Sequence, residues 1–207
     1  MEMKTLVLTG GGSAGHVMPC LALLPALREK YSLAYIGTDG IERGLLQGAG
    51  VPYYTIGCPK LVRGSLLRNV TLPCRFVSAV RQAKRALRDA HADAVFCAGG
   101  YVSLPVACAA HRLGIPAVSH ESDSTPGLAN RLIARHAARM TASFACAAEK
   151  LRGGICTGAP LRDALFAADR TAARAKYGFD GKKPVLLVFG GGSGSAGLNA
   201  AVRGAVG

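Results

Sequence analysis

The chain has 207 residues, of which 50% are hydrophobic and 18% charged; this composition excludes intrinsic disorder and permits a core without disulfide bonds. Its 25 Lys and Arg against 12 Asp and Glu give a formal net charge of +13, which favours anionic partners: nucleic acid, an acidic membrane or phosphorylated substrates. Its seven cysteines contain no CxxC pair and are interpreted as reduced thiols, so neither a disulfide framework nor a metal site is predicted.

Apolar runs and amphipathic segments alternate along the chain. The apolar runs predict strands over residues 5–9, 33–36, 94–97, 117–120 and 185–189. The clearest helix is expected over residues 75–90, where apolar residues recur on one face. Strands that look buried and that alternate with helices predict an α/β fold with a parallel sheet.

Two stretches of the sequence resemble each other. Residues 6–15 and 186–195 each consist of an apolar run, three glycines and the start of a helical pattern. This repetition predicts two Rossmann-like domains, the first over residues 1–160. Residues 161–207 are then a linker and the start of the second domain, which the chain contains only in part.

The first glycine loop is a candidate anion site. Gly10, Gly12 and Gly15 have the spacing G-x-G-x-x-G, which lets the backbone approach a diphosphate at a helix N-terminus. His16 follows directly, and a neutral imidazole at that place could accept a proton. Asp39, after the second predicted strand, keeps an NAD- or FAD-dependent oxidoreductase open as an alternative, and a plain tight turn or a packing histidine also remains possible.

Polar residues follow two further strands. His120 to Asn130 begin at the end of one predicted strand, and Gly99-Gly100-Tyr101 follow another. Ligand sites of parallel α/β sheets lie at the carboxyl ends of the strands, so both segments are candidate binding loops. An exposed helix-capping loop and a strained turn are the alternatives without a ligand.

Five motifs in order resemble the MurG family of peptidoglycan glycosyltransferases. They are GGGSAGHVMP (10–19), GGYVS (99–103), the segment GIP…HESD…PGLAN (114–130), TGAPLR (157–162) and the second glycine-rich run. The resemblance implies a GT-B fold of two Rossmann-like domains. It also implies an inverting, metal-independent transfer of N-acetylglucosamine from UDP-N-acetylglucosamine to the 4-hydroxyl of a muramyl sugar on undecaprenyl pyrophosphate, with no cofactor.

The resemblance also assigns roles to residues. His16 and Glu121 are the candidate general bases, and the other substrate-binding positions implied are Gly12, Ser13, Ala14, Gly15, Tyr101, Asp123, Asn130, Arg162 and Ser193. Asp123 stands where many members carry Asn, and the extra glycine makes the register at Ser193 ambiguous by one residue. Because full members are much longer, the chain is expected to be an incomplete and inactive form, and a non-catalytic acceptor-binding fragment is the alternative.

A basic, apolar stretch suggests a membrane surface. Eight Lys and Arg lie between Lys60 and Arg88, interleaved with apolar residues, which fits docking on anionic lipid. No aromatic platform or recognised motif accompanies the charge, so nucleic acid is not expected. No signal peptide or apolar run of membrane-spanning length is apparent, so a cytosolic protein is expected, with a peripheral membrane role left open. The family resemblance implies a peripheral place at the cytoplasmic face of the bacterial membrane.

Overall fold

The computed structural model describes residues 3–60, 70–181, 183–191 and 194–206. The chain divides into two compact units, residues 1–162 and residues 163–207. Each unit is described by itself below.

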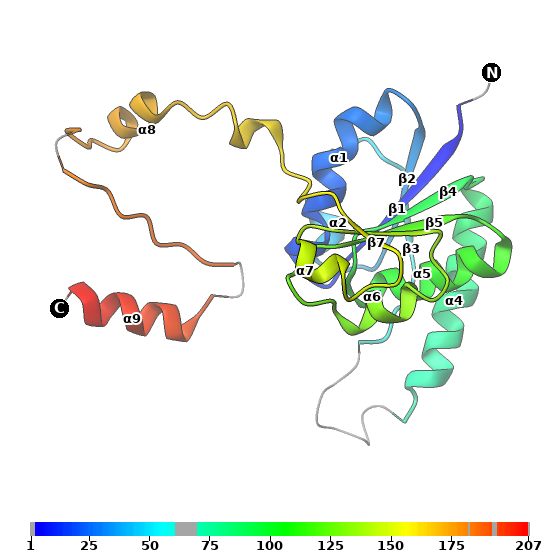
Figure 1. The fold of residues 1–207 in the computed structure, drawn as a ribbon. Helices are drawn as coiled ribbons and strands as arrows, with labels where there is room; N and C mark the ends of the chain where they lie inside the picture. The colour runs from blue at the N-terminus through cyan, green and yellow to red at the C-terminus, as the bar shows by residue number, and fades with distance from the viewer. Residues whose placement is uncertain (1–2, 61–69, 182, 192–193, 207) are drawn as a thin grey trace. The chain divides into compact units, whose positions relative to one another are not determined.

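The first unit is built on a parallel seven-stranded sheet with the strand order β3-β2-β1-β4-β5-β6-β7 (Figure 1). Every neighbouring pair of strands is parallel. The strands are β1 (Thr5–Thr9), β2 (Ser32–Gly37), β3 (Tyr53–Thr55), β4 (Ala94–Cys97), β5 (Ala117–Glu121), β6 (Arg139–Ala142) and β7 (Gly154–Cys156). The order reverses between β1 and β4, as it does at the ligand-binding crevice of doubly wound folds.

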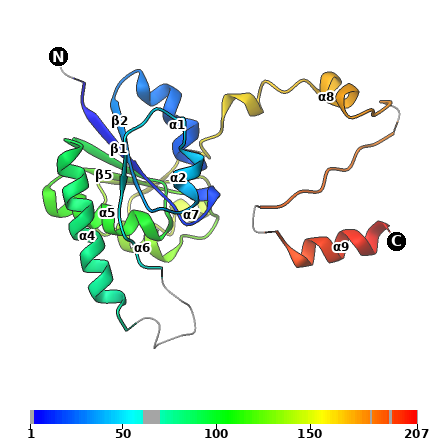
Figure 2. The same cartoon turned by 180° about the vertical axis from the view of Figure 1, so that it is seen from behind.

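Helices cover both faces of this sheet (Figures 1 and 2). The helices of the first unit are the short 3₁₀ helix η1 (Ala14–His16), α1 (Met18–Arg28), α2 (Ile41–Leu45), α4 (Leu72–Asp89), α5 (Gly100–Leu113), α6 (Leu128–Ile133) and α7 (Ala145–Ala148). Val7 of β1 packs in the core cluster that contains residues of α4 and α5, whereas its neighbour Leu8 packs with residues of α1. Successive side chains of a strand point to opposite faces, so a strand covered on both sides is apolar throughout.

Helix α4 owes its position to its amphipathic sequence. Val80, Ala83 and Leu87 recur at helical spacing and are buried, while Arg81 and Arg85 on the same helix are exposed. This apolar stripe packs in the same core cluster as Val102 and Val106 of α5.

The second unit contains only helices as regular structure within its described residues: the 3₁₀ helix η2 (Asp163–Leu165), α8 (Arg170–Lys176) and α9 (Ala196–Val206). The Asp169 carboxylate caps α8 by accepting hydrogen bonds from the backbone N–H groups of Thr171 and Ala172 at 2.7 and 3.1 Å.

The predicted parallel α/β sheet is confirmed, and four of the predicted strands form. The predicted strand over residues 185–189 is wrong, because these residues are described and adopt no strand. Its apolar side chains are exposed, with Leu186 and Phe189 at 88% and 80%. An apolar run needs neighbouring strands to satisfy its backbone groups, and the described part of this unit has none.

In the described residues, no helix is both long and apolar enough to cross a bilayer.

The core at α4 yields a stability prediction. Leu87 is fully buried, so Leu87→Ala should lower the free energy of unfolding of the first unit by about 2–5 kcal/mol. Arg85→Ala, an exposed change on the same helix, should stay within about 0.5 kcal/mol of the parent. Urea denaturation followed by circular dichroism measures both variants, and equal losses would contradict this packing of α4.

Candidate functional site

The candidate site lies where the strand order reverses, at the carboxyl ends of β1 and β4. The loop after β1 carries His16 within η1, and the turn after β4 consists of Ala98 and Gly99 before α5 begins at Gly100. Because β1 and β4 pair directly, the two connections leave the same edge of the sheet side by side. This is the place where the fold predicts a ligand.

The His16 imidazole is held through one ring nitrogen. Its Nδ1 lies 2.9 Å from the Ser13 hydroxyl oxygen, at hydrogen-bond distance. Among the described residues, no hydrogen-bond partner is found for Nε2. The residue is half-buried and lines a pocket, so Nε2 is available to a ligand.

The turn after β4 passes against this ring. A Cβ at Gly100 would lie 2.2 Å from the Gly11 carbonyl oxygen and 3.0 Å from His16 Nδ1. A Cβ at Gly99 would lie 3.1 Å from His16 Cδ2 and 3.4 Å from Asn130 Nδ2. Both glycines have a positive φ, 92° and 79°, which side chains disfavour. Only glycine at both positions lets the backbone of the second loop lie against the histidine of the first.

Glu121 ends β5 and is buried, with 3% of its surface exposed. Its Oε1 accepts a hydrogen bond from the Asp123 N–H at 3.0 Å, and its Oε2 accepts from the Gly127 N–H at 2.9 Å. Asn130 Nδ2 donates to the same Oε2 at 2.9 Å. The carboxylate therefore folds the loop over residues 121–127 and fixes the start of α6.

Asn130 ties α6 to β5. Its Nδ2 also donates to the His120 carbonyl at 3.1 Å, and its Oδ1 accepts from the Ser119 hydroxyl at 2.9 Å. Asn130 is only 4% exposed, and its side-chain amide is engaged in these hydrogen bonds. The structure thus brings His16, Glu121 and Asn130 together, as the sequence predicts, and it shows that two of the three hold the loop itself.

These elements enclose a pocket of about 650 Å³. Its lining includes His16, Glu121 and Asn130 together with Lys60, Leu72, Phe76, Tyr101 and Asp123. Tyr101 lies in the first turn of α5, and burial raises the pKa of its phenol. The pocket therefore combines an apolar wall from α4 with a histidine and a cation.

The other predicted residues are placed differently. Gly12, Ser13 and Gly15 are exposed in the loop after β1, and Ala14 begins η1 beside them. Arg162 is exposed at the end of the first unit, and Ser193 lies outside the described residues. Of the basic stretch, Arg63 and Arg68 also fall outside them.

The side chains of His120 and Glu121, which are consecutive in β5, point to opposite faces of the sheet. His120 is buried; its Nδ1 lies 2.9 Å from the Thr141 hydroxyl and its Nε2 lies 3.0 Å from the Ser143 hydroxyl. Burial lowers the pKa of this imidazole. It lines a separate pocket of about 300 Å³.

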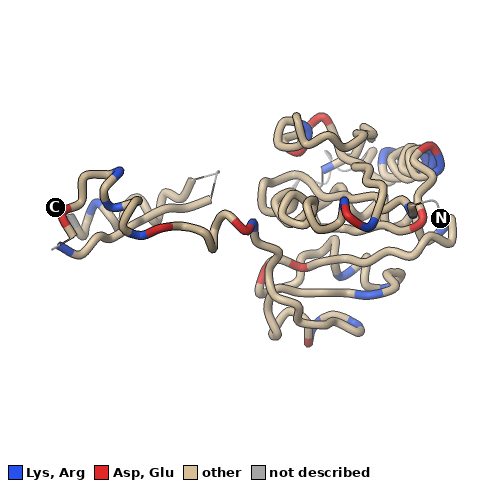
Figure 3. Tube along the Cα trace, turned by 90° about the horizontal axis from the view of Figure 1, so that it is seen from above, with Lys and Arg blue, Asp and Glu red and all other residues tan. Residues whose placement is uncertain are grey.

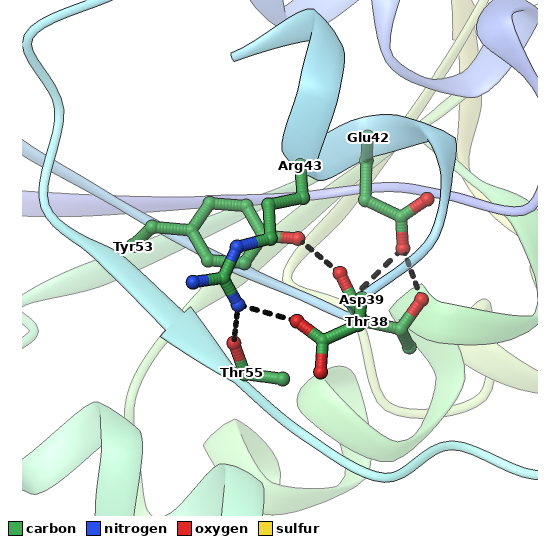
Figure 4. Close-up of polar contacts among 6 residues, drawn as sticks. All are labelled: Thr38, Asp39, Glu42, Arg43, Tyr53 and Thr55. Carbon is green, nitrogen blue, oxygen red and sulfur yellow. Dashed lines mark hydrogen bonds and ion pairs between the residues drawn. The ribbon is translucent and has the colours of Figure 1, made fainter. Parts of the chain in front are cut away.

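Sequence reasoning missed Glu42, a fully buried carboxylate next to the first glycine loop. Figure 4 shows it turned toward Thr38, whose N–H donates to Oε1 at 2.9 Å, while Arg43 turns toward Asp39 and Thr55. Asp39, the residue that kept a nicotinamide enzyme open, is thus in an exposed ion pair with Arg43. An acid five residues after the end of β2 has no signal of its own in a single sequence.

In the described part of the chain, no three His, Cys, Asp or Glu side chains come together as a metal site would require.

Residues 6–142 match the glycosyltransferase family 28 N-terminal domain. The UDP-N-acetylglucosamine--N-acetylmuramyl-(pentapeptide) pyrophosphoryl-undecaprenol N-acetylglucosamine transferase of Lachnospira eligens is 43% identical over 205 residues, covering 97% of this chain and 58% of that protein. The enzyme of the same name from Clostridium kluyveri is 42% identical with the same coverage. The chain therefore spans less than two thirds of the length of these curated relatives.

Solved structures agree on the fold. MurG of Acinetobacter baumannii superposes with a TM-score of 0.64 at 27% identity, over 78% of this chain and 46% of that one. The UDP-GlcNAc 2-epimerase of Neisseria meningitidis, bound to UDP-GlcNAc, gives a TM-score of 0.57 over 84% of this chain and 50% of that one, and its 16% identity supports the fold alone. The family match favours the transferase interpretation of the glycine loops over an oxidoreductase. The chain belongs to glycosyltransferase family 28, whose N-terminal domain it contains at residues 6–142.

Proposed function

We propose that the first unit is the acceptor-binding half of an enzyme that transfers N-acetylglucosamine from UDP-N-acetylglucosamine to an undecaprenyl-pyrophosphate-linked muramyl sugar, converting lipid I to lipid II. The observation that carries the proposal is the pocket at the strand-order reversal, where a histidine nitrogen with no hydrogen-bond partner among the described residues adjoins a glycine turn. The names of the curated relatives supply the substrates. No metal or cofactor takes part in the proposed reaction.

His16 is the proposed general base. The acceptor 4-hydroxyl attacks the anomeric carbon of the donor sugar, its proton passes to Nε2, and UDP leaves with the electron pair of the broken bond. The contact of Nδ1 with Ser13 restrains the ring of His16, which lines the pocket. A base positioned in this way contributes about 10²–10⁴-fold in rate.

Glu121 has a different part in this proposal. Its carboxylate accepts three hydrogen bonds from Asp123, Gly127 and Asn130, all of which hold the loop that walls the pocket. We therefore assign it, together with Asn130, to positioning the loop. Tyr101 and Asp123 line the same pocket and are proposed to contact the acceptor.

The acceptor diphosphate is proposed to lie at the first turn of α5. This 14-residue helix begins at Gly100, directly beside His16, and Lys60 lines the same pocket. A helix N-terminus offers free N–H groups and a positive dipole end to an anion. Leu72 and Phe76 give this pocket an apolar wall that suits a lipid-linked ligand.

Helix α4 is the proposed contact with an anionic membrane surface. Arg75, Arg81 and Arg85 are exposed on it, and the helix also supplies Leu72 and Phe76 to the acceptor pocket. Figure 3 shows Lys and Arg on this helix and on several other parts of the first unit. The enzyme would dock peripherally at the cytoplasmic face of the membrane. Its acceptor pocket would then lie close to the lipid-bound acceptor.

The donor is proposed to be bound through Arg162, Ser193 and residues beyond the first unit, as the family resemblance implies. In the described residues of the second unit, no sheet supports a nucleotide site. The 207-residue chain by itself is therefore proposed to be inactive.

The first prediction tests the base. In a chimera that joins this chain to the remaining part of the Lachnospira eligens transferase, His16→Ala should lower kcat about 10²–10⁴-fold and leave the KM for UDP-N-acetylglucosamine nearly unchanged. His111→Ala is the matched control, because His111 is exposed and stacks on His136 with ring centroids 4.3 Å apart. Near-normal turnover of His16→Ala would contradict the assignment, and Glu121→Gln would then be measured in the same assay.

The second prediction tests membrane docking. Replacement of Arg75, Arg81, Lys84 and Arg85 by Gln should weaken sedimentation with vesicles that contain anionic lipid, most strongly at low salt. Each cation near such a surface is worth about 1 kcal/mol. Four exposed cations outside α4, namely Arg112, Arg135, Arg139 and Lys150, serve as the charge-matched control. If both sets lower binding equally, the net charge and not α4 attracts the protein to lipid.

The third prediction concerns the chain as it stands. Calorimetry with UDP-N-acetylglucosamine should detect no binding in the micromolar range, because the described residues of the second unit contain no sheet that the apolar run over residues 185–189 could join. The chimera described above is the positive control. Micromolar binding or turnover by the 207-residue chain would show that the donor site has been misplaced.

A further inference from the structure

Glu42 is a buried acid that forms no ion pair within the described residues. The residue is 0% exposed and lies in α2, and the one ion pair found within the described residues joins its neighbour Arg43 to Asp39. A buried carboxylate persists only where hydrogen-bond donors replace the lost water. Its partners therefore show what the residue does.

All partners of this carboxylate are donors, and they come from two loops. Thr38 supplies its N–H at 2.9 Å and its hydroxyl to Oε1, from the turn after β2. The Gly12 N–H of the first glycine loop points to Oε2 at 3.5 Å, a long contact. In the arrangement of Figure 4, Glu42 and Thr38 form one group, and Arg43 forms another with Asp39 and Thr55.

The glycine loop is shaped around this group. A Cβ at Gly11 would lie 2.7 Å from Glu42 Oε1, and one at Gly40 would lie 2.9 Å from Oε2. The Tyr35 hydroxyl donates to the Gly10 carbonyl at 2.7 Å, so a second buried side chain holds the same loop. The Glu42 carboxylate thus lies, on the protein side, against the glycine loop whose backbone N–H groups could otherwise bind an external anion.

Glu42 contributes to the raised pKa values of two neighbouring side chains, Cys58 and Tyr53. Burial, and then the charge of Glu42, raise the pKa of the Cys58 thiol to about 12. Burial, and then the same charge, raise the pKa of the Tyr53 phenol. Both shifts follow from burial and from the nearness of the Glu42 carboxyl group.

We infer that Glu42 is a positioning residue that acts as the internal anion of the first glycine loop. It holds Gly12 and packs closely against Gly11, so that the loop presents His16 to its pocket. It also fills with its own charge the place at which a Rossmann loop would receive a phosphate, so an external anion is directed to the His16 side. The inference rests on the proposed function only for the identity of that external ligand.

The test uses the 207-residue chain with ¹⁵N-glycine and labelled histidine. Glu42→Gln keeps the shape but replaces one acceptor oxygen by an NH₂ donor, which cannot accept from Gly12 or from the Thr38 N–H. Hydrogen exchange of the Gly12 amide should then become about tenfold faster, because one hydrogen bond to a charged group is lost. The NMR signals of the His16 ring should shift as well. Asp39→Asn is the matched control, because it removes an exposed carboxylate three residues away and should change neither signal. Unchanged Gly12 exchange and His16 signals in Glu42→Gln would overturn the inference.

A second measurement covers the case in which Glu42→Gln does not fold. In the unaltered chain, the Gly12 amide should exchange more slowly than that of Ser13, whose N–H has no partner among the described residues. Equal exchange of the two amides would overturn the inference.

Titration with a soluble, short-chain lipid-diphosphate-linked muramyl acceptor separates this inference from the proposed function. Weaker binding by Glu42→Gln than by Asp39→Asn supports both. If the parent binds no acceptor while the Gly12 and His16 signals still respond to Glu42→Gln, the positioning role stands and the proposed function fails.

Discussion

The site depends on the close approach of two connections at the carboxyl edge of the sheet, the loop after β1 and the turn after β4. The turn after β4 lies so near the loop after β1 that a Cβ on Gly100 would be 2.2 Å from the Gly11 carbonyl. The Ala98 N–H donates to the Thr9 carbonyl at 2.7 Å, and the Ser103 hydroxyl donates to the Gly99 carbonyl at 2.7 Å, which hold the turn in this place. The imidazole of His16 is thereby set directly against the beginning of α5. Without this contact, His16 and the N-terminus of α5 would not lie together in one site.

Two buried carboxylates organise the loops on either side of this contact. Glu42 holds the first glycine loop and Glu121 holds the loop before α6, and in the described residues each is bound by N–H or O–H donors and by no cation. Removing a partner from such a group leaves a buried charge without compensation, so both loops are fixed tightly. Rigid loops around a histidine with one ring nitrogen unengaged by the described residues suit a transfer reaction in which two substrates must be aligned.

The first unit was predictable where the sequence carries long periodic signals, because β1, β4 and α4 are apolar or amphipathic over their whole length. The short strands β3 and β7, of three residues each, and β6, which begins with Arg139, carry too little pattern to be found. The run over residues 185–189 looked like a strand because its composition is right, but a strand also requires neighbours. At the site, the glycine turns and His16 were recognisable from spacing, whereas Glu42 was not, since its importance comes from a contact across 30 residues. The engagement of Glu121 and Asn130 in hydrogen bonds within the loop could likewise be learned only from the structure.

The proposed place of the acceptor diphosphate is between His16 and the start of α5. Backbone and imidazole NMR signals of the 207-residue chain, followed during titration with the soluble lipid-diphosphate-linked acceptor, test it most directly. We expect the largest changes at His16, Gly99, Gly100 and Tyr101. Largest changes at Asp39, Arg43 and Tyr53, which line a different pocket at the ends of β2 and β3, would contradict it.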